Sequence, residues 1–158
     1  MFKIENLTES ARESVCNQIA ESWGAVFIVT RGILHDTRLL EGFVAMENGT
    51  VAGYALYKLS DGECELVVLE SLSSAPGIGS ALINTVLVVA RDAKSRRLWL
   101  ITTNDNTHAI RFYQKRGFEL RAVHINAMDE ARLLKPQIPQ TGEDGIPIKH
   151  EFEFEIML

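Results

Sequence analysis

The chain has 158 residues, of which 46% are hydrophobic and 23% are charged. These values are typical of one globular domain that buries a core, and we expect a single domain over residues 1–158. The net charge of −5 argues against a nucleic-acid partner, which would favour a basic face. The longest apolar run, residues 86–90, is too short to span a membrane, and the first residues lack the apolar segment of a secretory signal. We therefore expect a cytoplasmic protein that contacts no membrane.

The first predicted helix follows a short strand at residues 2–6. Ser10 and Glu13 have the spacing of an S-x-x-E capping box, in which two side chains bond free amides at a helix start. Thr8 is the alternative start. Gly24 follows the last apolar residue of the helical repeat, and glycine is common just past a helix end. We therefore expect a helix from Thr8 or Ser10 to Gly24.

The middle of the chain predicts β-structure. Asn48-Gly49 is a dipeptide that readily accepts the positive φ angles of a type I′ hairpin turn. The strand after this hairpin contains a run of Val and Leu, which indicates burial on both faces. We expect residues 25–30 to be extended and residues 31–41 to form an irregular or briefly helical connector. Strands are expected at residues 43–47, 51–59 and 64–72.

The second half predicts alternating helices and strands. A helix with a buried apolar stripe follows the glycine-containing turn near residue 77. Asp105 or Asn106 is expected to cap a further helix that stops at Gly117. Phenylalanine and glutamate alternate in the last segment, which predicts a half-buried strand with the glutamates of residues 151–155 in solvent. Strands are expected at residues 98–102, 120–125 and 150–158, a short helix at 129–135, and a loop at 136–147.

The order of these elements is typical of an α+β fold with a mixed sheet. The strand–helix–strand unit of residues 64–102 should be parallel, with a right-handed crossover. Cys16 lies in a predicted helix and Cys64 in a predicted strand. We expect two buried free thiols rather than a disulfide.

A glycine-containing turn joins the central strand to the helix that follows. Residues 74–80 read Ser-Ala-Pro-Gly-Ile-Gly-Ser. Free N–H groups at a helix start attract anions, and glycine lets the backbone approach a ligand closely. The turn is not a Walker loop, because no Lys-Ser or Lys-Thr pair follows the glycines. Taken alone, such a turn is more often explained by backbone geometry.

A second segment changes this interpretation. Residues 104–118 match the pattern N-x-x-A-x-x-F-Y-x-x-x-G-F, and residues 74–79 stand where the pattern R/Q-x-x-G-x-G/A is expected. With both segments in order, residues 43–125 resemble the GNAT superfamily of acetyl-CoA-dependent N-acetyltransferases. Ser74 departs from the usual Arg or Gln, and Pro76 brings no N–H. The resemblance implies a mixed, mostly antiparallel sheet with helices on both faces and a splayed pair of parallel strands. The residues that match the second pattern are Asn106, Ala109, Phe112, Tyr113, Gly117 and Phe118.

The resemblance implies that acetyl-CoA is the co-substrate and that no metal is needed. The pyrophosphate would bind amides at the start of the helix, and the pantetheine arm would pair with the end of the central strand like an added strand. Asn104 or Asn106 would bond the arm from the other side. The expected cofactor-binding residues are Ser71, Leu72, Ala75, Gly77, Ile78, Gly79, Ser80, Asn104, Asn106, Phe112 and Tyr113.

Three residues are candidates for proton transfer. The resemblance places Tyr113 as the general acid that meets the leaving thiolate. An alkyl amine is largely protonated at pH 7, so a carboxylate would take its proton, and Glu70 or Glu65 on the central strand could do so. We favour Glu70, which lies nearer the strand's end. The two differ by an odd number, so they face opposite sides unless a bulge intervenes. A backbone amide near Ser71 or Leu72 would polarise the thioester oxygen.

The acceptor is not readable from the sequence. We predict direct attack by a primary amine of a small molecule in a ternary complex. A protein N-terminal or lysine acetyltransferase and a non-catalytic acyl-CoA sensor are the alternatives. Loss of Tyr113 would mark a sensor, and Tyr113 is present. The sequence does not reveal the oligomeric state, so a homodimer stays an open alternative.

Overall fold

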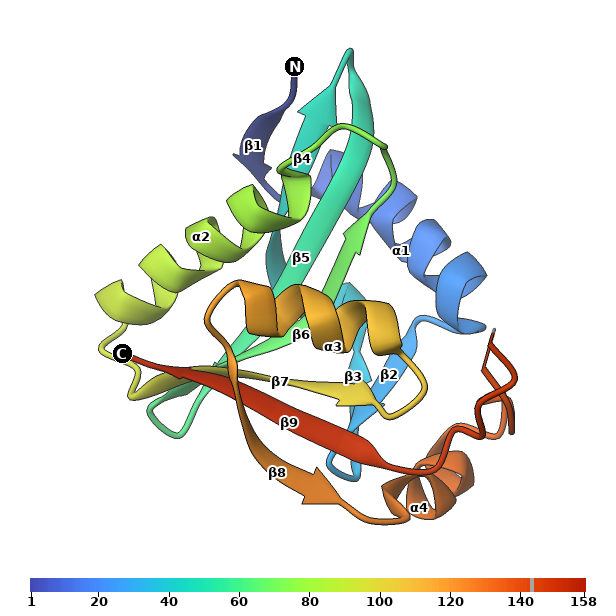
Figure 1. Cartoon of the computed structure of the whole chain (residues 1–158). Helices are drawn as coiled ribbons and strands as arrows, with labels where there is room; N and C mark the ends of the chain where they lie inside the picture. The colour runs from blue at the N-terminus through green and yellow to red at the C-terminus, as the bar shows by residue number, and fades with distance from the viewer. Residues whose placement is uncertain (143) are drawn as a thin grey trace.

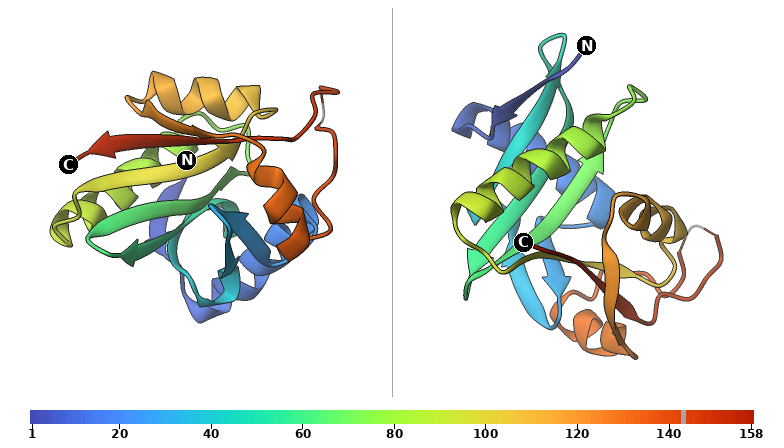
Figure 2. Two further views of the ribbon diagram at one scale, coloured as in Figure 1. Left: turned by 90° about the horizontal axis from the view of Figure 1, so that it is seen from below. Right: turned by 60° about the vertical axis from the view of Figure 1, so that its left-hand side comes forward.

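The computed structural model describes residues 1–142 and 144–158 and has a mixed α+β architecture (Figure 1). A seven-stranded, mostly antiparallel sheet has the order β1-β4-β5-β6-β7-β9-β8, and β2 and β3 form a separate two-stranded sheet. The helices lie on both faces of the large sheet, as the two further views show (Figure 2). The predicted fold class is therefore confirmed. Among the described helices, none is long and apolar enough to cross a membrane.

The strands of the large sheet are β1 (Lys3–Asn6), β4 (Glu41–Glu47), β5 (Thr50–Ser60), β6 (Glu63–Ser71), β7 (Arg97–Thr103), β8 (Glu119–His124) and β9 (Glu151–Met157). The small hairpin consists of β2 (Phe27–Thr30) and β3 (Ile33–Asp36). The helices are α1 (Glu9–Trp23), α2 (Ile78–Asp92), α3 (Thr107–Lys115) and α4 (Ala127–Leu134), with a short 3-10 turn at Thr37–Leu39.

Three hairpins share the same turn geometry, and one is the turn at Asp61 and Gly62 between β5 and β6, with φ angles of 55° and 75°. Asn48 and Gly49 have φ angles of 51° and 77°, so the predicted type I′ turn between β4 and β5 is confirmed. Arg31 and Gly32 have φ angles of 49° and 74° and join β2 to β3. The predicted irregular or briefly helical connector of residues 31–41 was wrong up to residue 36, because arginine seldom adopts a positive φ and its presence hid the turn. The 3-10 turn at Thr37–Leu39 confirms the brief helix.

The predicted end of α1 is confirmed, and the predicted capping box is wrong. Gly24 has a φ of 82° and follows the last helical residue. Thr8 is the N-cap, and Ser10 lies inside the first turn, where its hydroxyl bonds the Thr8 hydroxyl at 2.9 Å. The helix thus begins at the alternative start.

Two apolar cores lie on opposite faces of the large sheet. On one face, α2 and the residues around Tyr113 pack against β5, β6, β7 and β9. On the other, Val15 and Ile19 of α1 pack against β4, β5 and β6. Cys16 and Cys64 are both buried and free, as predicted. The sheet therefore separates a face covered by α2 and α3 from a face covered by α1 and the β2–β3 hairpin (Figure 1).

The prediction that the C-terminal glutamates face solvent was wrong. β9 is the last strand in the sequence but lies between β7 and β8, so it is an inner strand. Glu151 and Glu153 are buried. Arg97 donates to a Glu153 carboxylate oxygen at 2.6 Å, and His124 lies 2.9 Å from the other. The alternation of phenylalanine and glutamate correctly predicted a strand. Local sequence does not reveal that charged partners cover the face of β9 that carries the glutamates.

Candidate active site

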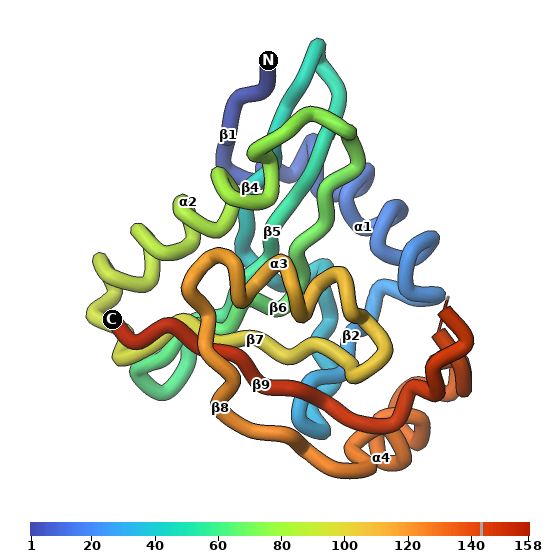
Figure 3. Tube along the Cα trace, in the orientation of Figure 1, coloured from blue at the N-terminus to red at the C-terminus, as the bar shows by residue number. Residues whose placement is uncertain are grey.

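The site forms where the two parallel strands separate. β6 and β7 run parallel, as predicted, and pair at Cys64–Leu98 and Glu65–Trp99 within the described residues. Beyond these pairs the strands diverge, which the Cα trace shows (Figure 3). A cavity of about 690 Å³ occupies this region, lined by residues 66–69 of β6 and 101–103 of β7. The remaining walls come from the end of α1, from β2, α3 and α4, and from residues 137–139, 141, 142, 144 and 148.

The edge of β6 that faces this cavity offers backbone amides. The Leu72 N–H donates to the Ala52 carbonyl at 2.8 Å, on the β5 side. Because N–H groups alternate in direction along a strand, those of Leu69 and Ser71 point toward the gap. Of the two amides expected near the thioester, that of Leu72 is therefore engaged by β5, which leaves the Ser71 amide for the thioester oxygen. The assignments of Ser71 and Leu72 as cofactor-binding residues both stay predictions.

The start of α2 forms the expected anion-attracting terminus. Gly77 is the N-cap with a φ of 90°, a conformation that favours glycine. The Ala81 N–H donates to the Gly77 carbonyl at 2.9 Å, so the amides of Ile78, Gly79 and Ser80 precede the first intrahelical bond. The Ala75 N–H already donates to the Ser73 hydroxyl at 3.1 Å, which argues against its predicted role.

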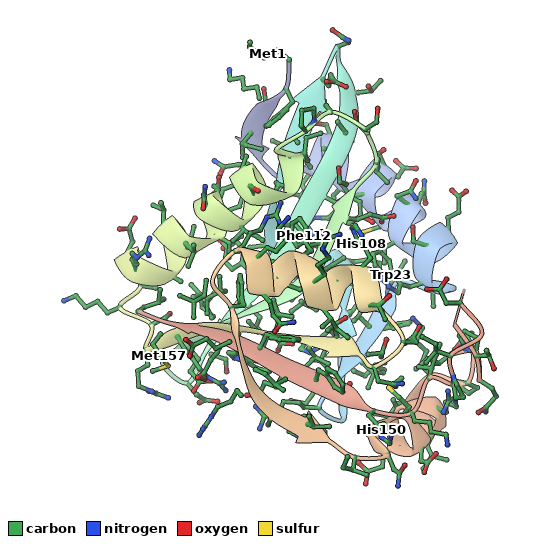
Figure 4. The ribbon with its side chains drawn as sticks, viewed as in Figure 1. Met1, Trp23, His108, Phe112, His150 and Met157 are labelled. Atoms are coloured by element: carbon green, nitrogen blue, oxygen red, sulfur yellow. The ribbon has the colours of Figure 1, made fainter. Side chains whose placement is uncertain are left out.

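Arg116 adds a cation to this terminus, and sequence reasoning missed it. Its Nε donates to the Ser80 hydroxyl at 2.9 Å, and its guanidinium lies 3.4 Å from the centre of the Phe112 ring. A side chain at Gly79 would place its Cβ 2.7 Å from Phe112 Cζ. Phe112 therefore joins α3 to the first turn of α2, and Figure 4 labels it beside His108 on α3. The sequence feature that could have indicated this role is the basic pair Lys115-Arg116, which directly precedes Gly117 at the end of α3.

The two asparagines after β7 have different roles. Asn104 Oδ1 accepts from the backbone N–H groups of Lys149 and His150, and its Nδ2 donates to the Pro147 carbonyl, each at 2.9 Å. It holds the loop before β9 and is not among the described residues that line the cavity, so we favour Asn106 for the contact with the cofactor. Asn106 caps α3 by accepting from the Ala109 N–H at 3.1 Å. This residue lines the cavity at the start of α3.

Tyr113 lies on the cavity wall, packed edge-on against two rings. The ring centres of Phe112 and Phe118 are 5.3 Å and 5.4 Å away. Burial raises the pKa of Tyr113 above its usual value. The phenol therefore keeps its proton throughout the neutral range and can donate a hydrogen bond into the cavity.

A β-bulge places both candidate glutamates on one face of β6. The register between β5 and β6 shifts between Leu56 and Tyr57, so that Val67 is an extra residue. The regular alternation is broken there, and Glu65 and Glu70 both face the side of α1 and the β2–β3 hairpin. The exception that sequence reasoning left open is the observed case.

Glu65 lies in a buried hydrogen-bonded network. The Thr30 hydroxyl donates to Glu65 Oε2 at 2.6 Å, and His35 Nε2 lies 2.7 Å from the same hydroxyl. Burial raises the pKa of Glu65 to about 7 and lowers that of His35 to about 4. Thr30 lines the cavity, so it links the cavity to the Glu65 carboxylate behind it.

Glu70 is held differently. Ser22, near the end of α1, donates to Glu70 Oε1 at 2.8 Å, and the Tyr54 hydroxyl donates to Oε2. Both carboxylate oxygens therefore already have hydroxyl donors. Ser22 and its neighbour Trp23 line the cavity, and Figure 4 labels Trp23 there.

Two further buried charged residues line the cavity that sequence reasoning did not identify. Glu151, at the start of β9, is 2% exposed, and Lys135, just after α4, is 5% exposed. Glu151 was predicted to be solvated, and Lys135 was treated only as the end of a short helix. Their burial follows from tertiary packing, which no local pattern predicts.

Comparison with known proteins shows the family. The sequence model described as the Acetyltransferase (GNAT) family matches residues 4–118. The uncharacterized protein YdhI of Bacillus subtilis is 40% identical over 147 residues, which cover 92% of each chain. The chain therefore belongs to the GNAT family of acetyltransferases, whose members transfer an acetyl group from acetyl-CoA to an amine.

Solved structures share the fold at low sequence identity. An IAA acetyltransferase from Bacillus cereus is similar with a TM-score of 0.73 at 18% identity, covering all of both chains. A GNAT family acetyltransferase from Elizabethkingia anophelis with acetyl-CoA bound is similar with a TM-score of 0.69 at 18% identity, covering 99% of this chain and 98% of that one. At this level of identity, these likenesses show the fold.

The distinction between the two asparagines can be tested with a matched pair of variants. Asn104→Ala removes three hydrogen bonds and should lower the free energy of unfolding by about 2 to 3 kcal/mol. Asn106→Ala should cost about 1 kcal/mol through the lost helix cap and weaken CoA binding about tenfold. Urea unfolding and calorimetric titration with CoA measure the two effects. Weaker CoA binding in Asn104→Ala with unchanged stability would contradict the assignment.

Proposed function

We propose that this protein transfers an acetyl group from acetyl-CoA to a primary amine of a small molecule, by direct attack in a ternary complex. The observation that supports this most is the cavity between β6 and β7, which reaches Tyr113 on one side and the Thr30–Glu65 pair on the other. A donor and an acceptor entering from opposite faces would meet there.

In this proposal, the cofactor extends from the start of α2 to Tyr113. The amides of Ile78, Gly79 and Ser80, together with Arg116, would bind the pyrophosphate, since oriented N–H groups and a guanidinium suit phosphate oxygens. The pantetheine arm would pair with the open edge of β6 through the amides of residues 69 and 71. The amide group of Asn106 would bond the arm from the α3 side.

The chemical step then needs three groups. The amine nitrogen attacks the thioester carbon, the carbon–sulfur bond breaks, and the sulfur leaves as a thiolate. The Ser71 N–H would stabilise the negative charge that develops on the carbonyl oxygen. Tyr113 would donate a hydrogen bond to the thiolate. Because burial raises the pKa of Tyr113, complete proton transfer is uphill, and the bond stabilises the charge as it forms.

We infer that Glu65, acting through Thr30, takes the proton from the acceptor amine, in place of the Glu70 favoured by sequence position. Thr30 lines the cavity, and its hydroxyl donates to Glu65 Oε2. A carboxylate with a pKa of about 7 is a stronger base than an ordinary glutamate. Glu70 already binds two hydroxyl donors.

A small acceptor fits the enclosure of this side. The end of α1, β2, α4 and residues 137–139, 141, 142, 144 and 148 line the cavity, and Asn104 holds the loop before β9 in place. A protein acetyltransferase would need an open cleft for a peptide segment. Acetylation of a peptide panel with no transfer to small amines would favour that alternative.

The proposed role of Tyr113 is tested by Tyr113→Phe. The wild type should consume acetyl-CoA with at least one member of a panel of small primary amines. The variant keeps the ring packing, so we expect kcat to fall about 10- to 1,000-fold while CoA affinity changes little. Thiol release measures kcat, and calorimetric titration measures affinity. An unchanged kcat would make Tyr113 a packing residue.

The choice of base is tested by a pH profile. The Glu65 carboxylate acts as a base only when ionised, so wild-type kcat/KM should rise with pH through a limb near pH 7 and fall below it. Glu65→Gln should remove this limb and lower kcat/KM about 100-fold or more. Thr30→Val, which keeps the shape, should reproduce most of the loss. If Glu70→Gln instead removes the limb and Glu65→Gln retains it, the base is Glu70.

A further inference from the structure

Two buried side chains of opposite charge line the acceptor side of the cavity. Lys135 follows the last residue of α4, and Glu151 begins β9. They form no ion pair with each other in the described structure. The two charged side chains therefore line the same cavity without neutralising each other.

Lys135 has a buried side chain on a cavity wall that also carries apolar residues. Met128, Ile138 and Ile148 form a small apolar cluster beside it on the same wall. Among residues 1–142 and 144–158, neither a carboxylate nor another acceptor bonds its Nζ. An ammonium withdrawn from water is costly unless an anion compensates it. Burial accordingly lowers the pKa of Lys135.

The phosphates of the cofactor do not suit Lys135 as a partner. They would bind at the start of α2, and α4 lies at the opposite end of the molecule from that turn (Figures 1 and 3). Between the two lies the stretch of β6 and α3 where the thioester would sit. An anion at Lys135 would therefore belong to the acceptor.

Glu151 supplies the complementary charge. It pairs with Thr103 across β7 and β9, beside the residues of β7 that line the cavity. One of its oxygens accepts from the Arg31 backbone N–H at 3.2 Å. Burial raises the pKa of Glu151, and a bound ammonium would offset that cost.

We propose that the acceptor is an amine that also carries an anionic group, with the anion bound by Lys135 and the ammonium bound by Glu151. This inference rests on the proposed function and names the substrate class of that site. Once bound, the ammonium loses its proton to Glu65 through Thr30 and becomes the nucleophile. Amino acids, other amino-carboxylates and phosphate-bearing amines share this chemistry, and the distance between amine and anion selects among them.

The experiment compares matched acceptors in wild type and in variants of Lys135. Glycine, β-alanine, γ-aminobutyrate and lysine are each paired with the carboxamide that lacks the negative charge, and phosphoethanolamine is paired with ethanolamine. We expect wild-type kcat/KM to be about 10- to 100-fold higher for the anionic member of at least one pair. Lys135→Met should remove this preference by lowering kcat/KM for the anionic member to about the value of its neutral partner. Lys135→Arg should retain part of it.

Lys149→Met, at an exposed position of the same segment, is the control and should change neither member of a pair. A wild type that acetylates neutral amines as well as anionic ones, or a Lys135→Met variant that loses both equally while folded, overturns the inference. If Lys135→Met does not fold, the inference is tested by two results. The wild type should prefer the anionic acceptor, and Lys135→Arg should retain part of that preference.

Failure of the proposed function has a different signature. It would appear as no acetyl transfer to any amine, with no binding of CoA by calorimetry. In that case, binding of the acceptor compounds, without catalysis, tests whether Lys135 recognises the anion. The same compounds, added without CoA, should raise the unfolding temperature of the wild type more when anionic, and Lys135→Met should remove the difference. An equal rise from both members of every pair would overturn the inference.

Discussion

The separation of β6 from β7 is the constraint on which the site depends. The two strands pair at Cys64–Leu98 and Glu65–Trp99 and then diverge, while each keeps its other neighbour. The divergence leaves one edge of β6 without a strand partner in the described structure and opens a passage between the two faces of the sheet. A fully paired sheet would have closed that passage and would have used the same amides for ladder bonds.

The bulge at Val67 determines which side chains reach this passage. A regular strand would point one of the two glutamates toward α2. With one extra residue, Glu65 and Glu70 both face the α1 side, where hydroxyl groups from different elements bind them. In the mechanism that we propose, the two sides of the passage therefore differ in chemistry. The side of the leaving thiol, near Tyr113, is aromatic, and the side of the acceptor amine contains the buried carboxylates.

The sequence predicted those features that depend on local chemistry. The Asn48-Gly49 turn, the glycine that ends α1 and the Asn106 cap follow from conformational preferences that hold in any fold. The two motifs correctly indicated the family and the fold. Prediction from sequence was less successful where an answer depends on neighbours in space. Asn104 looked like a ligand to the cofactor until its three bonds to the loop were visible.

Buried charge was the feature most hidden from the sequence. An alternating strand with glutamates on one face is usually half solvated, and the inner position of β9 reverses that expectation. The same applies to Lys135, since a lysine at the end of a short helix is normally exposed. Neither the register of a sheet nor the path of a long loop is encoded in a few adjacent residues, so these charges were identified only in the folded chain.

In the mechanism that we propose, acetyl-CoA occupies the gap along the open edge of β6. Hydrogen exchange of the backbone amides, measured by mass spectrometry with and without acetyl-CoA, tests this most directly. We predict slower exchange over residues 67–72, 77–81 and 104–113, with little change in β1, β4 and the first turns of α1. Unchanged exchange in the β6 and α2 segments under saturating acetyl-CoA, or protection confined to other parts of the sheet, would contradict it.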